Sequence, residues 1–430
     1  MDSLVVGFCL LAILAVLLLS GAWVFISLFA TGALGLSLLL GYPLDRIGSL
    51  AARVILSSAQ KWELSAIPLF IFMGELICRT DIAERVFKGL LPIVARIPGT
   101  LLHTNVLGSV VFGAVSGSSS ATTAMVGKIT LPSLEARGFD RRHAIGALAA
   151  SGGLGMLIPP SIMLIVYGVL VEQSILQLFA AGVIPSLFIA ALFALYIAIR
   201  FRKTDTAREE SSYSFRDVIH LAPVGTLFLI VFGAIYSGMA TPSESAAIGV
   251  LATIIVMGLL RQLRMKIIFD SMISASVISA MICIILVFAT FLSSAVGFLH
   301  LPQNIATSLE PLVGNPFLLI LVLAIFYQIL GFFLDGISIA VMTLPIVYPL
   351  AIAAGFDPIW FGIFLVIMVE AGLITPPLGL NLFIVRGLTG ESIATIAIAS
   401  LPYYLLMLLA TAVFVLIPDI VLWLPEQMRK

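Results

Sequence analysis

The sequence predicts an all-α polytopic membrane protein with two re-entrant hairpins and two discontinuous helices, arranged as an inverted repeat. Three observations predict this fold class. Of the 430 residues, 61% are hydrophobic and 10% are charged, and the mean hydropathy is +1.20, which is outside the usual range of soluble globular domains. The charged residues are separated by long charge-free stretches, and a motif that ends in a double proline occurs twice. This composition excludes a water-soluble enzyme.

Charge and cysteine content exclude two further classes. The 22 basic and 22 acidic side chains cancel, so no basic surface is available for nucleic acid. Cys9, Cys78 and Cys283 lie in apolar stretches at separations that fit neither a disulfide framework nor a zinc site. We expect no cofactor.

Charge-free stretches predict the membrane spans, because a bilayer core is crossed by roughly 20 apolar residues. The first stretch lacks a basic region and a cleavage site, so it is expected to remain as the first helix. A long helix is expected from about 271 to 299. The stretches without Asp, Glu, Lys or Arg are 3–44, 97–127, 143–171, 173–199, 218–243, 271–309, 311–334 and 392–418.

Basic residues between the spans predict the orientation of the chain. Segment 201–217 is the one clear hydrophilic linker, and segment 261–266 is also basic. We therefore place both in the cytoplasm, joined by a hairpin of helices 218–238 and 243–260.

The same reasoning places segment 300–316, which has no Lys or Arg, on the outer side of the membrane. Counting spans from there puts both termini on the outer side. Segment 42–61 carries three basic residues, although this count places it on the outer side of the membrane. We therefore interpret it as an interfacial helix.

A faint repeat divides the chain. In each copy Thr-Leu-Pro, beginning at Thr130 and Thr343, is followed by Gly-Phe-Asp and then by a double proline. Gly138 and Gly355 both stand 20 residues before the residue that precedes the double proline. Because the orientation places the two Gly-Phe-Asp segments on opposite sides, the repeats are predicted to be inverted, as in many secondary transporters. The first repeat covers 1–200 and the second 218–430.

Each double proline falls within a predicted span. Proline removes a backbone donor and clashes with the preceding turn, and nearby glycines add flexibility. A kink satisfied by neighbouring helices would explain one such site. Two at equivalent repeat positions favour discontinuous helices, at about 141–172 and 358–388.

Hairpins are predicted upstream of the two breaks. Six of the eight residues 116–123 are Ser or Thr, and too few apolar residues follow for a second crossing. We therefore predict a re-entrant hairpin at about 98–137 from the cytoplasmic side and a matching one at about 316–354 from the outer side. Helix packing through small residues is the alternative for the Ser/Thr run.

Together these elements would build a binding site from interrupted backbone. Half-helices beginning after Gly117, after Gly336 and at each double proline would point their N-termini toward mid-membrane, where free amides and helix dipoles can hold a carboxylate. Hydroxyl and carbonyl oxygens suit a hard monovalent cation such as sodium. Asp335 is either a charged ligand of this cation or a helix N-cap, and Glu370 is a weaker candidate because no partner can be named. Glu244 has a sufficient structural role in a capping box with Thr241.

At these residues the sequence resembles the large membrane (M) subunit of the tripartite ATP-independent periplasmic, or TRAP, transporters. The resemblance covers almost the whole chain. Ser243 and Ser245 depart conservatively from the family pattern, which favours Thr-Pro-Thr-Glu-Ala-Ala-Ala. The motifs that carry the resemblance are Ala66-Ile-Pro-Leu-Phe-Ile-Phe-Met-Gly-Glu75, Ser116-Gly-Ser-Ser-Ser-Ala121, Ile158-Pro-Pro-Ser161, Thr241-Pro-Ser-Glu-Ser-Ala-Ala-Ile-Gly249 and Thr375-Pro-Pro-Leu-Gly-Leu-Asn381.

The resemblance implies an elevator-type transporter of the bacterial inner membrane that takes up a small organic acid, such as a C4-dicarboxylate or a sulfonate, with sodium as the coupling ion. It also implies a small four-helix membrane (Q) subunit as a separate chain and a periplasmic solute-binding (P) protein. Both termini would then be periplasmic. Implied sodium ligands are Ser116, Ser118, Ser119, Gly152 and Gly153 for one ion and Asp335, Gly336, Thr375 and Gly379 for the other. The candidates for substrate binding are Ser118, Ser119, Ser120, Pro160, Ser161, Ser338, Pro377 and Asn381.

Two alternatives remain at this stage. A stand-alone divalent-anion/sodium symporter would use similar hairpins without a binding protein. An intramembrane enzyme is the alternative from a different class, but the sequence contains no His-Glu-x-x-His or Gly-x-Gly-Asp motif, and its four histidines are isolated or lie at span ends.

Overall fold

A computed structural model describes residues 3–202, 214–301, 314–377 and 379–428. These residues form helices and contain no β-strand. Helices before the linker are α1 (Ser3–Leu19), α2 (Val24–Leu40), α3 (Leu44–Ala59), η1 (Trp62–Ser65), α4 (Ala66–Cys78), α5 (Ile82–Val94), η2 (Thr100–Leu102), α6 (His103–Ser116), α7 (Ser119–Ala136), α8 (Arg141–Ser151), α9 (Leu154–Leu157), α10 (Ile162–Val171) and α11 (Ile175–Arg200).

The second half continues the all-helical architecture. Its helices are η4 (Phe215–Leu221), α12 (Ala222–Tyr236), α13 (Pro242–Leu259), α14 (Met265–Phe298), α17 (Pro316–Gly331), α18 (Gly336–Ala353), α19 (Pro358–Leu373), α20 (Leu380–Thr389), α21 (Ile393–Leu416) and α22 (Asp419–Gln427). Residues 203–213 of the predicted linker and 302–313 of the predicted outer segment lie outside the described residues.

Within the described residues, six helices are long and apolar enough to cross a bilayer. There are seven such spans if α8–α9 and α10, which are bent by 42° at their break, count as one. The chain therefore has the makeup of a multi-pass membrane protein. The long helix predicted at 271–299 is α14, which begins earlier, at Met265, and has 34 residues. At 1.5 Å per residue it is about 51 Å long, more than the ~30 Å hydrocarbon core.

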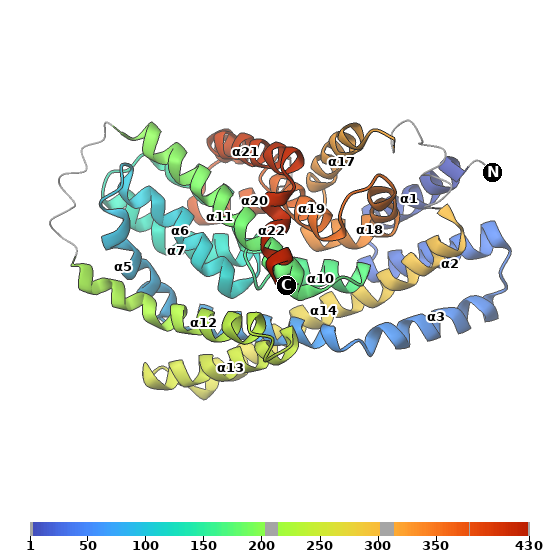
Figure 1. The fold of residues 1–430 in the computed structure, drawn as a ribbon, viewed down its shortest axis with the longest axis horizontal. Helices are drawn as coiled ribbons and strands as arrows, with labels where there is room; N and C mark the ends of the chain where they lie inside the picture. Colours follow the sequence, from blue (N-terminus) through green and yellow to red (C-terminus); the bar gives the residue numbers. More distant parts are fainter. Residues whose placement is uncertain (1–2, 203–213, 302–313, 378, 429–430) are drawn as a thin grey trace.

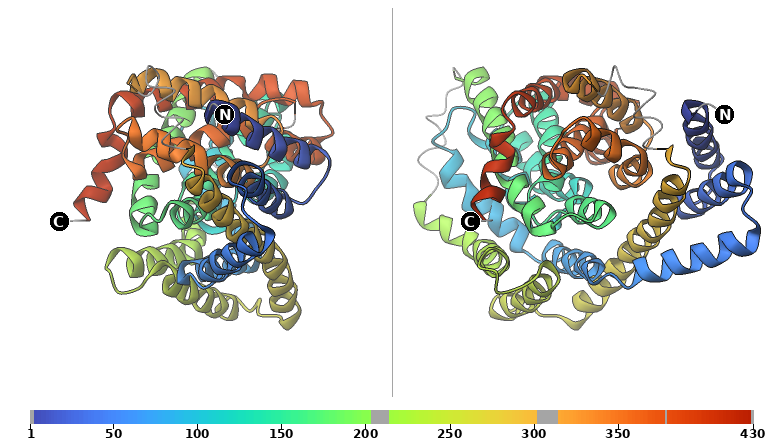
Figure 2. Two further views of the ribbon diagram at one scale, coloured as in Figure 1. Left: turned by 90° about the vertical axis from the view of Figure 1, so that its right-hand side faces the viewer. Right: turned by 45° about the vertical axis from the view of Figure 1, so that its right-hand side comes forward.

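The helices form an outer arc and an enclosed core (Figures 1 and 2). Helices α2, α3, α12, α13 and α14 run along one side, and α4 packs against α13 and α14. Polar contacts tie the arc together: the Arg79 guanidinium donates to Ser274 Oγ at 2.7 Å, and the Ser58 and Thr290 hydroxyls are 3.1 Å apart. The core contains α6–α11 and α17–α21.

The two hairpins and two discontinuous helices of the predicted fold class are present. The predicted hairpin at 98–137 consists of α6 and α7, and the one at 316–354 of α17 and α18. The helix predicted at 141–172 is interrupted between α9 and α10, and the one at 358–388 between α19 and α20. Each double proline contains a cis peptide bond.

Two smaller predictions also have structural counterparts. The predicted capping box is confirmed, because Thr241 Oγ1 accepts from the Glu244 amide and the Glu244 carboxylate accepts from the Thr241 amide at 2.8 Å. The segment predicted as an interfacial helix is α3, which packs Ile47 and Ala51 against α14. Its position relative to the bilayer stays a prediction.

Candidate functional site

The tip of the first hairpin contacts the break in the first discontinuous helix. Gly117 ends α6 with a φ of 59°, a left-handed conformation that favours glycine. Its carbonyl oxygen accepts a hydrogen bond from the Ile162 amide at 3.4 Å. A Cβ atom on Gly117 would lie 2.6 Å from the carbonyl oxygen of Pro160. The hairpin tip and the break therefore meet at a backbone contact that excludes a side chain.

Threonines of the same hairpin pack on glycines of the break. A Cβ atom on Gly155 would lie 2.5 Å from Thr122 Oγ1, and one on Gly152 would overlap the Thr123 hydroxyl. Thr122 Oγ1 also lies 2.8 Å from Ser116 Oγ. The hydroxyls that meet these glycines are thus those of Thr122 and Thr123, which the predicted first ion group did not include, and Ser116 of that group contacts Thr122.

Serines begin the helices on either side of this contact. Ser118 is the N-cap of α7 and accepts from the Ala121 amide at 3.4 Å. Ser161 is the N-cap of α10, accepts from the Leu164 amide at 3.2 Å and donates to the Met156 carbonyl. The second half-helix therefore begins after Pro160 and not at the prolines, because the serine cap sets its first residue. Ser120 is half-buried.

The second hairpin begins its return helix at Asp335. This exposed residue is the N-cap of α18, and its carboxylate accepts from the amide and hydroxyl of Ser338. A Cβ atom on Gly336 would lie 2.9 Å from Val369 of α19 and 3.4 Å from Met156 of α9. The structure thus shows the capping role of Asp335 and places its hairpin tip against both discontinuous helices.

The predicted second ion group is divided between the hairpin tip and the second break. Thr375 Oγ1 donates to the Gly372 carbonyl at 2.7 Å, and the Gly379 amide donates to the Thr375 carbonyl at 3.1 Å. Among the described residues no hydrogen bond joins Asp335 to Thr375 or Gly379. Pro377 is exposed, and α20 begins three residues later at Leu380.

A glycine pair occurs at the equivalent place in each half. A Cβ atom on Gly113 of α6 would lie 2.6 Å from the Cα atom of Gly155, and one on Gly331 of α17 would lie 2.5 Å from that of Gly372. Gly155 and Gly372 each stand four residues before the first proline of their double proline. Both hairpins therefore touch their discontinuous helix, backbone to backbone, in the same register.

One polar cluster connects the two halves. Ser119 Oγ of α7 donates to Glu370 Oε2 of α19 at 2.9 Å and accepts from Asn381 Nδ2 of α20 at 2.8 Å. All three residues are buried, with 0%, 1% and 0% of their surface exposed. Sequence reasoning named Ser119 and Asn381 but found no partner for Glu370. The sequence signal that could have pointed to Glu370 was its position, because it is an isolated acidic residue six positions before a double proline.

The chemistry of these elements is that of neutral oxygens and helix N-termini. Within the described parts of the chain, no group of three or more His, Cys, Asp or Glu side chains could hold a metal ion. The beginnings of α7, α10, α18 and α20 provide backbone amides and positive dipole ends, which are suited to an anion. Ser and Thr hydroxyls and backbone carbonyls provide ligands for a hard cation.

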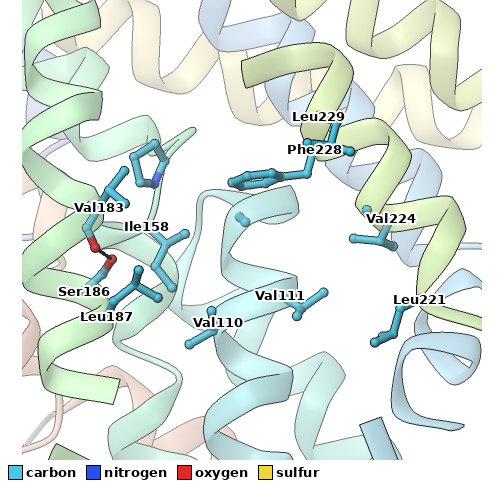
Figure 3. Close-up of a pocket in the computed structure, with 13 residues that line it drawn as sticks. Val110, Val111, Ile158, Val183, Ser186, Leu187, Leu221, Val224, Phe228 and Leu229 are labelled. Atoms are coloured by element: carbon cyan, nitrogen blue, oxygen red, sulfur yellow. Dashed lines mark hydrogen bonds between the residues drawn. The ribbon is translucent and has the colours of Figure 1, made fainter. Parts of the chain in front are cut away.

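A cavity lies between part of the core and part of the arc (Figure 3). It has a volume of about 460 Å³ and is lined almost entirely by apolar side chains of α6, the first break, α11, η4 and α12. Val110, Val111 and Ile158 face Val224 and Phe228 across it. Such a lining does not suit an anion, so this cavity is not the polar site described above.

On the surface, Lys61 next to η1 forms an ion pair with Glu172 at the end of α10, with 2.8 Å between Nζ and Oε1. The hydrogen bond from Lys61 holds the pKa of Glu172 below its usual value. Because Glu172 is exposed, this link contributes little to stability.

Comparisons with known proteins agree with this architecture. The family described as "Tripartite ATP-independent periplasmic transporter, DctM component" matches residues 11–420. The C4-dicarboxylate TRAP transporter large permease protein DctM of Pseudomonas aeruginosa is 33% identical over 404 residues, which cover 93% of this chain and 94% of that protein. The sialic acid TRAP transporter large permease protein SiaM of Vibrio cholerae is 30% identical over 389 residues, covering 87% and 89%.

Among solved structures, the YdaH transporter of Alcanivorax borkumensis has a similar fold, with a TM-score of 0.64 at 14% identity and 88% of each chain covered. This likeness concerns the fold alone. The family match spans nearly the whole chain, and the curated relatives match it over most of their length. The chain therefore belongs to the DctM family, the large permease component of the tripartite ATP-independent periplasmic transporters.

Proposed function

We propose that this protein takes up a small organic acid across the bacterial inner membrane by coupling its movement to sodium. The observation that carries the proposal is the meeting of each hairpin with a discontinuous helix, which gathers helix N-termini and uncharged oxygens. Among the described residues no Lys or Arg side chain is buried. Curated relatives are named for C4-dicarboxylate, isethionate and sialic acid, all of which carry an acidic group. We propose a substrate of the same class.

In this mechanism the half-helix N-termini hold the acid group of the substrate. Helices α7 and α10 both begin close to the first break, where Gly117 and Pro160 meet. Sodium at Ser116, Ser118, Ser119, Gly152 and Gly153, and at Asp335, Gly336, Thr375 and Gly379, would offset the negative charge of the substrate. Ser120, Pro160, Ser161, Ser338, Pro377 and Asn381 would face the substrate. This is the reason for the coupling: bound sodium makes the site electrostatically more favourable for the acid, and the bound acid makes it more favourable for sodium.

The core is proposed to move against the arc in an elevator motion. Polar contacts such as Arg79–Ser274 and Ser58–Thr290 lie within the arc, whereas the boundary with the core contains the apolar cavity of Figure 3. Gly74 of α4 brings its backbone close to the hairpin tip, since a Cβ atom there would lie 3.3 Å from Ser116 Cα. Across the boundary, Lys61 pairs with the exposed Glu172 and donates to the Val169 carbonyl at 3.5 Å, so we expect the sliding motion to break this link.

A four-helix small subunit and a periplasmic binding protein are proposed as partners. In proteoliposomes that contain the full complex, we expect concentrative uptake of the acid supplied by the binding protein when sodium is outside, and loss of concentrative uptake when choline replaces sodium. Scintillation counting of a radiolabelled C4-dicarboxylate or sialic acid measures this uptake. Equal accumulation in the two buffers would refute the coupling. Transport by the chain without its partners would instead identify a stand-alone symporter.

The charge of Asp335 is expected to matter for sodium. Asp335→Asn keeps an N-cap residue but removes the charge, so the sodium concentration for half-maximal uptake should rise up to about fivefold, because an exposed charge contributes ~1 kcal/mol at most. Glu244→Gln is the matched control, since glutamine also completes a capping box. Sodium titrations of initial uptake rates compare the two variants. Equal shifts in both would contradict the assignment of Asp335 to an ion site.

A further inference from the structure

A lysine of the arc contacts the end of a core helix. Lys61 lies between α3 and η1, and its ammonium group donates to Glu172 Oε1 at 2.8 Å and to the Val169 carbonyl oxygen at 3.5 Å. Both acceptors lie at the C-terminal end of α10. The last carbonyl oxygens of a helix have no partner within the helix, and a cation there also interacts favourably with the helix dipole. Lys61 therefore caps α10 from the other side of the boundary.

The arc holds the backbone of Lys61 in place. Lys61 is the N-cap of η1, and this short helix packs against α4 and α13. The hydroxyl of Ser243, at the start of α13, donates to the Trp62 carbonyl oxygen at 3.2 Å. The lysine is therefore expected to move with the arc.

The core holds the acceptors in a closed turn between α10 and α11. Glu172 ends α10 with a φ of 56°, and the amide of Gln173 donates to the Gly168 carbonyl oxygen at 2.9 Å. The Gln173 side chain also donates to the Tyr348 hydroxyl of α18 at 3.5 Å. A Cβ atom on Gly168 would lie 3.0 Å from Leu178 of α11, so the turn has little room to shift. The acceptors are therefore expected to move with the core.

The link between the two parts is weak enough to open. The side chains of Lys61 and Glu172 are 27% and 77% exposed, and ion pairs of this kind contribute little to stability. A cavity of about 410 Å³, lined by both residues and by Glu63, lies at the same place. Separation would thus leave each charge near water instead of burying it without a partner, which is the costly case.

The capped helix connects this link with the proposed binding site. Helix α10 begins at Ile162, next to the break where Gly117 meets Pro160, and has 10 residues. At 1.5 Å per residue it is about 15 Å long. Most of its residues are buried within the core. One short helix therefore has its first turn at the site and its last turn at the contact with the arc.

We propose that Lys61 is a reversible latch between arc and core. Its contacts with Glu172 and Val169 favour the arrangement described here, and they open when the core slides. This proposal deepens the proposed elevator motion and rests on it. Because the ion pair is exposed, the latch biases the balance between two arrangements and does not lock one of them. Without the latch, the population of the described arrangement relative to the other should fall by up to about fivefold.

Distances between spin labels measure these two populations. The labels are attached at Met239→Cys, between α12 and α13, and at Ala353→Cys, at the end of α18, because both positions are exposed. The native cysteines are replaced by serine, and the full-length chain with its small subunit is reconstituted in lipid nanodiscs. We expect double electron–electron resonance to show two distances, one for each arrangement. Lys61→Met and Glu172→Gln should each shift the ratio toward the second distance by up to about fivefold.

Glu63→Gln is the matched control. Glu63 is exposed, lines the same cavity and forms no ion pair among the described residues, so removal of its charge should leave the ratio of distances unchanged. The double variant of Lys61→Glu with Glu172→Lys places opposite charges at the two positions again. Its ratio should therefore lie closer to wild type than that of either reversal alone.

The measurements separate failure of the latch from failure of the proposed function. Two distances whose ratio is unchanged in Lys61→Met and Glu172→Gln, or is shifted equally in Glu63→Gln, would overturn the latch and leave the elevator motion standing. A single distance in every variant, with and without sodium, would refute the motion and the latch with it. Sodium dependence of uptake is measured in proteoliposomes, so failure of the coupling is recognised separately.

A cross-link provides the second arm. Lys61→Cys and Glu172→Cys are combined in the chain that lacks native cysteines and are joined by a short bismaleimide, and the intact mass gives the linked fraction. We expect uptake by the complete transporter to fall in proportion to the linked fraction, whereas either single cysteine treated with the same reagent should retain most of the uptake. Full uptake by linked transporters would overturn the proposal, because the core would then move without separating from Lys61.

Discussion

Gly117→Ala is expected to reduce sodium-dependent uptake by at least about tenfold, whereas Gly138→Ala should leave most of it. Both glycines have a positive φ, of 59° and 76°, so alanine costs about 1–2 kcal/mol in backbone strain at either position. At Gly117 the new methyl group would also lie 2.6 Å from the Pro160 carbonyl oxygen, while at Gly138 no atom lies within 4 Å. Overpacking of this kind adds about 1–3 kcal/mol. A tenfold loss of uptake corresponds to about 1.4 kcal/mol, which lies within this range.

The comparison separates the contact from the backbone strain. Initial uptake rates are measured in proteoliposomes with both partners present and are divided by the amount of folded transporter. Because strain is common to the two variants, the difference between them reports the closing of the hairpin tip on the first break. Equal losses in the two variants would contradict a functional role for the Gly117–Pro160 contact.

Local chemistry explains why the hairpins and breaks could be predicted. Proline removes a backbone donor and clashes with the preceding turn, but single prolines such as Pro185 of α11 and Pro402 of α21 lie within continuous helices. The breaks were identified by the doubled prolines at 159–160 and 376–377 and by the glycines near them. The Ser/Thr run at 116–123 likewise indicated a hairpin, because too few apolar residues follow it for a second crossing. The prediction was least accurate where boundaries depend on capping, since Ser161 and Gly379 move the helix starts beyond the prolines.

Contacts between the halves could not be predicted in this way. Ser119 and Glu370 are 251 positions apart, and nothing in either local sequence specifies the other. For Asp335 the sequence left two roles, ion ligand or N-cap; the structure shows the N-cap, and the ligand role stays a prediction. The glycine pairs were also missed as pairs, since a close backbone approach becomes evident only when two helices are placed together.

Gly113→Ala and Gly331→Ala should each destabilise the chain, although the same substitution stabilises most helices. In a helix interior alanine is favoured over glycine by roughly 0.5–1 kcal/mol. Here the added methyl group would meet the Cα atom of the paired glycine at 2.6 Å or 2.5 Å, and backbone cannot move aside as a flexible side chain can. We expect a net loss of about 1–3 kcal/mol.

Gly225 and Gly233 of α12 provide the matched controls, because no atom lies within 4 Å of a Cβ atom at either position. Thermal unfolding of the purified full-length chain in detergent should show a lower midpoint for the two hairpin variants and an unchanged or higher one for the two controls. Because Gly155 and Gly372 occupy the same register before their double prolines, the two hairpin variants should lose similar amounts. A hairpin variant that melts like the α12 controls would show that its helix can separate from the break at no cost. That result would remove the physical basis for treating the two contacts as equivalent parts of a repeat.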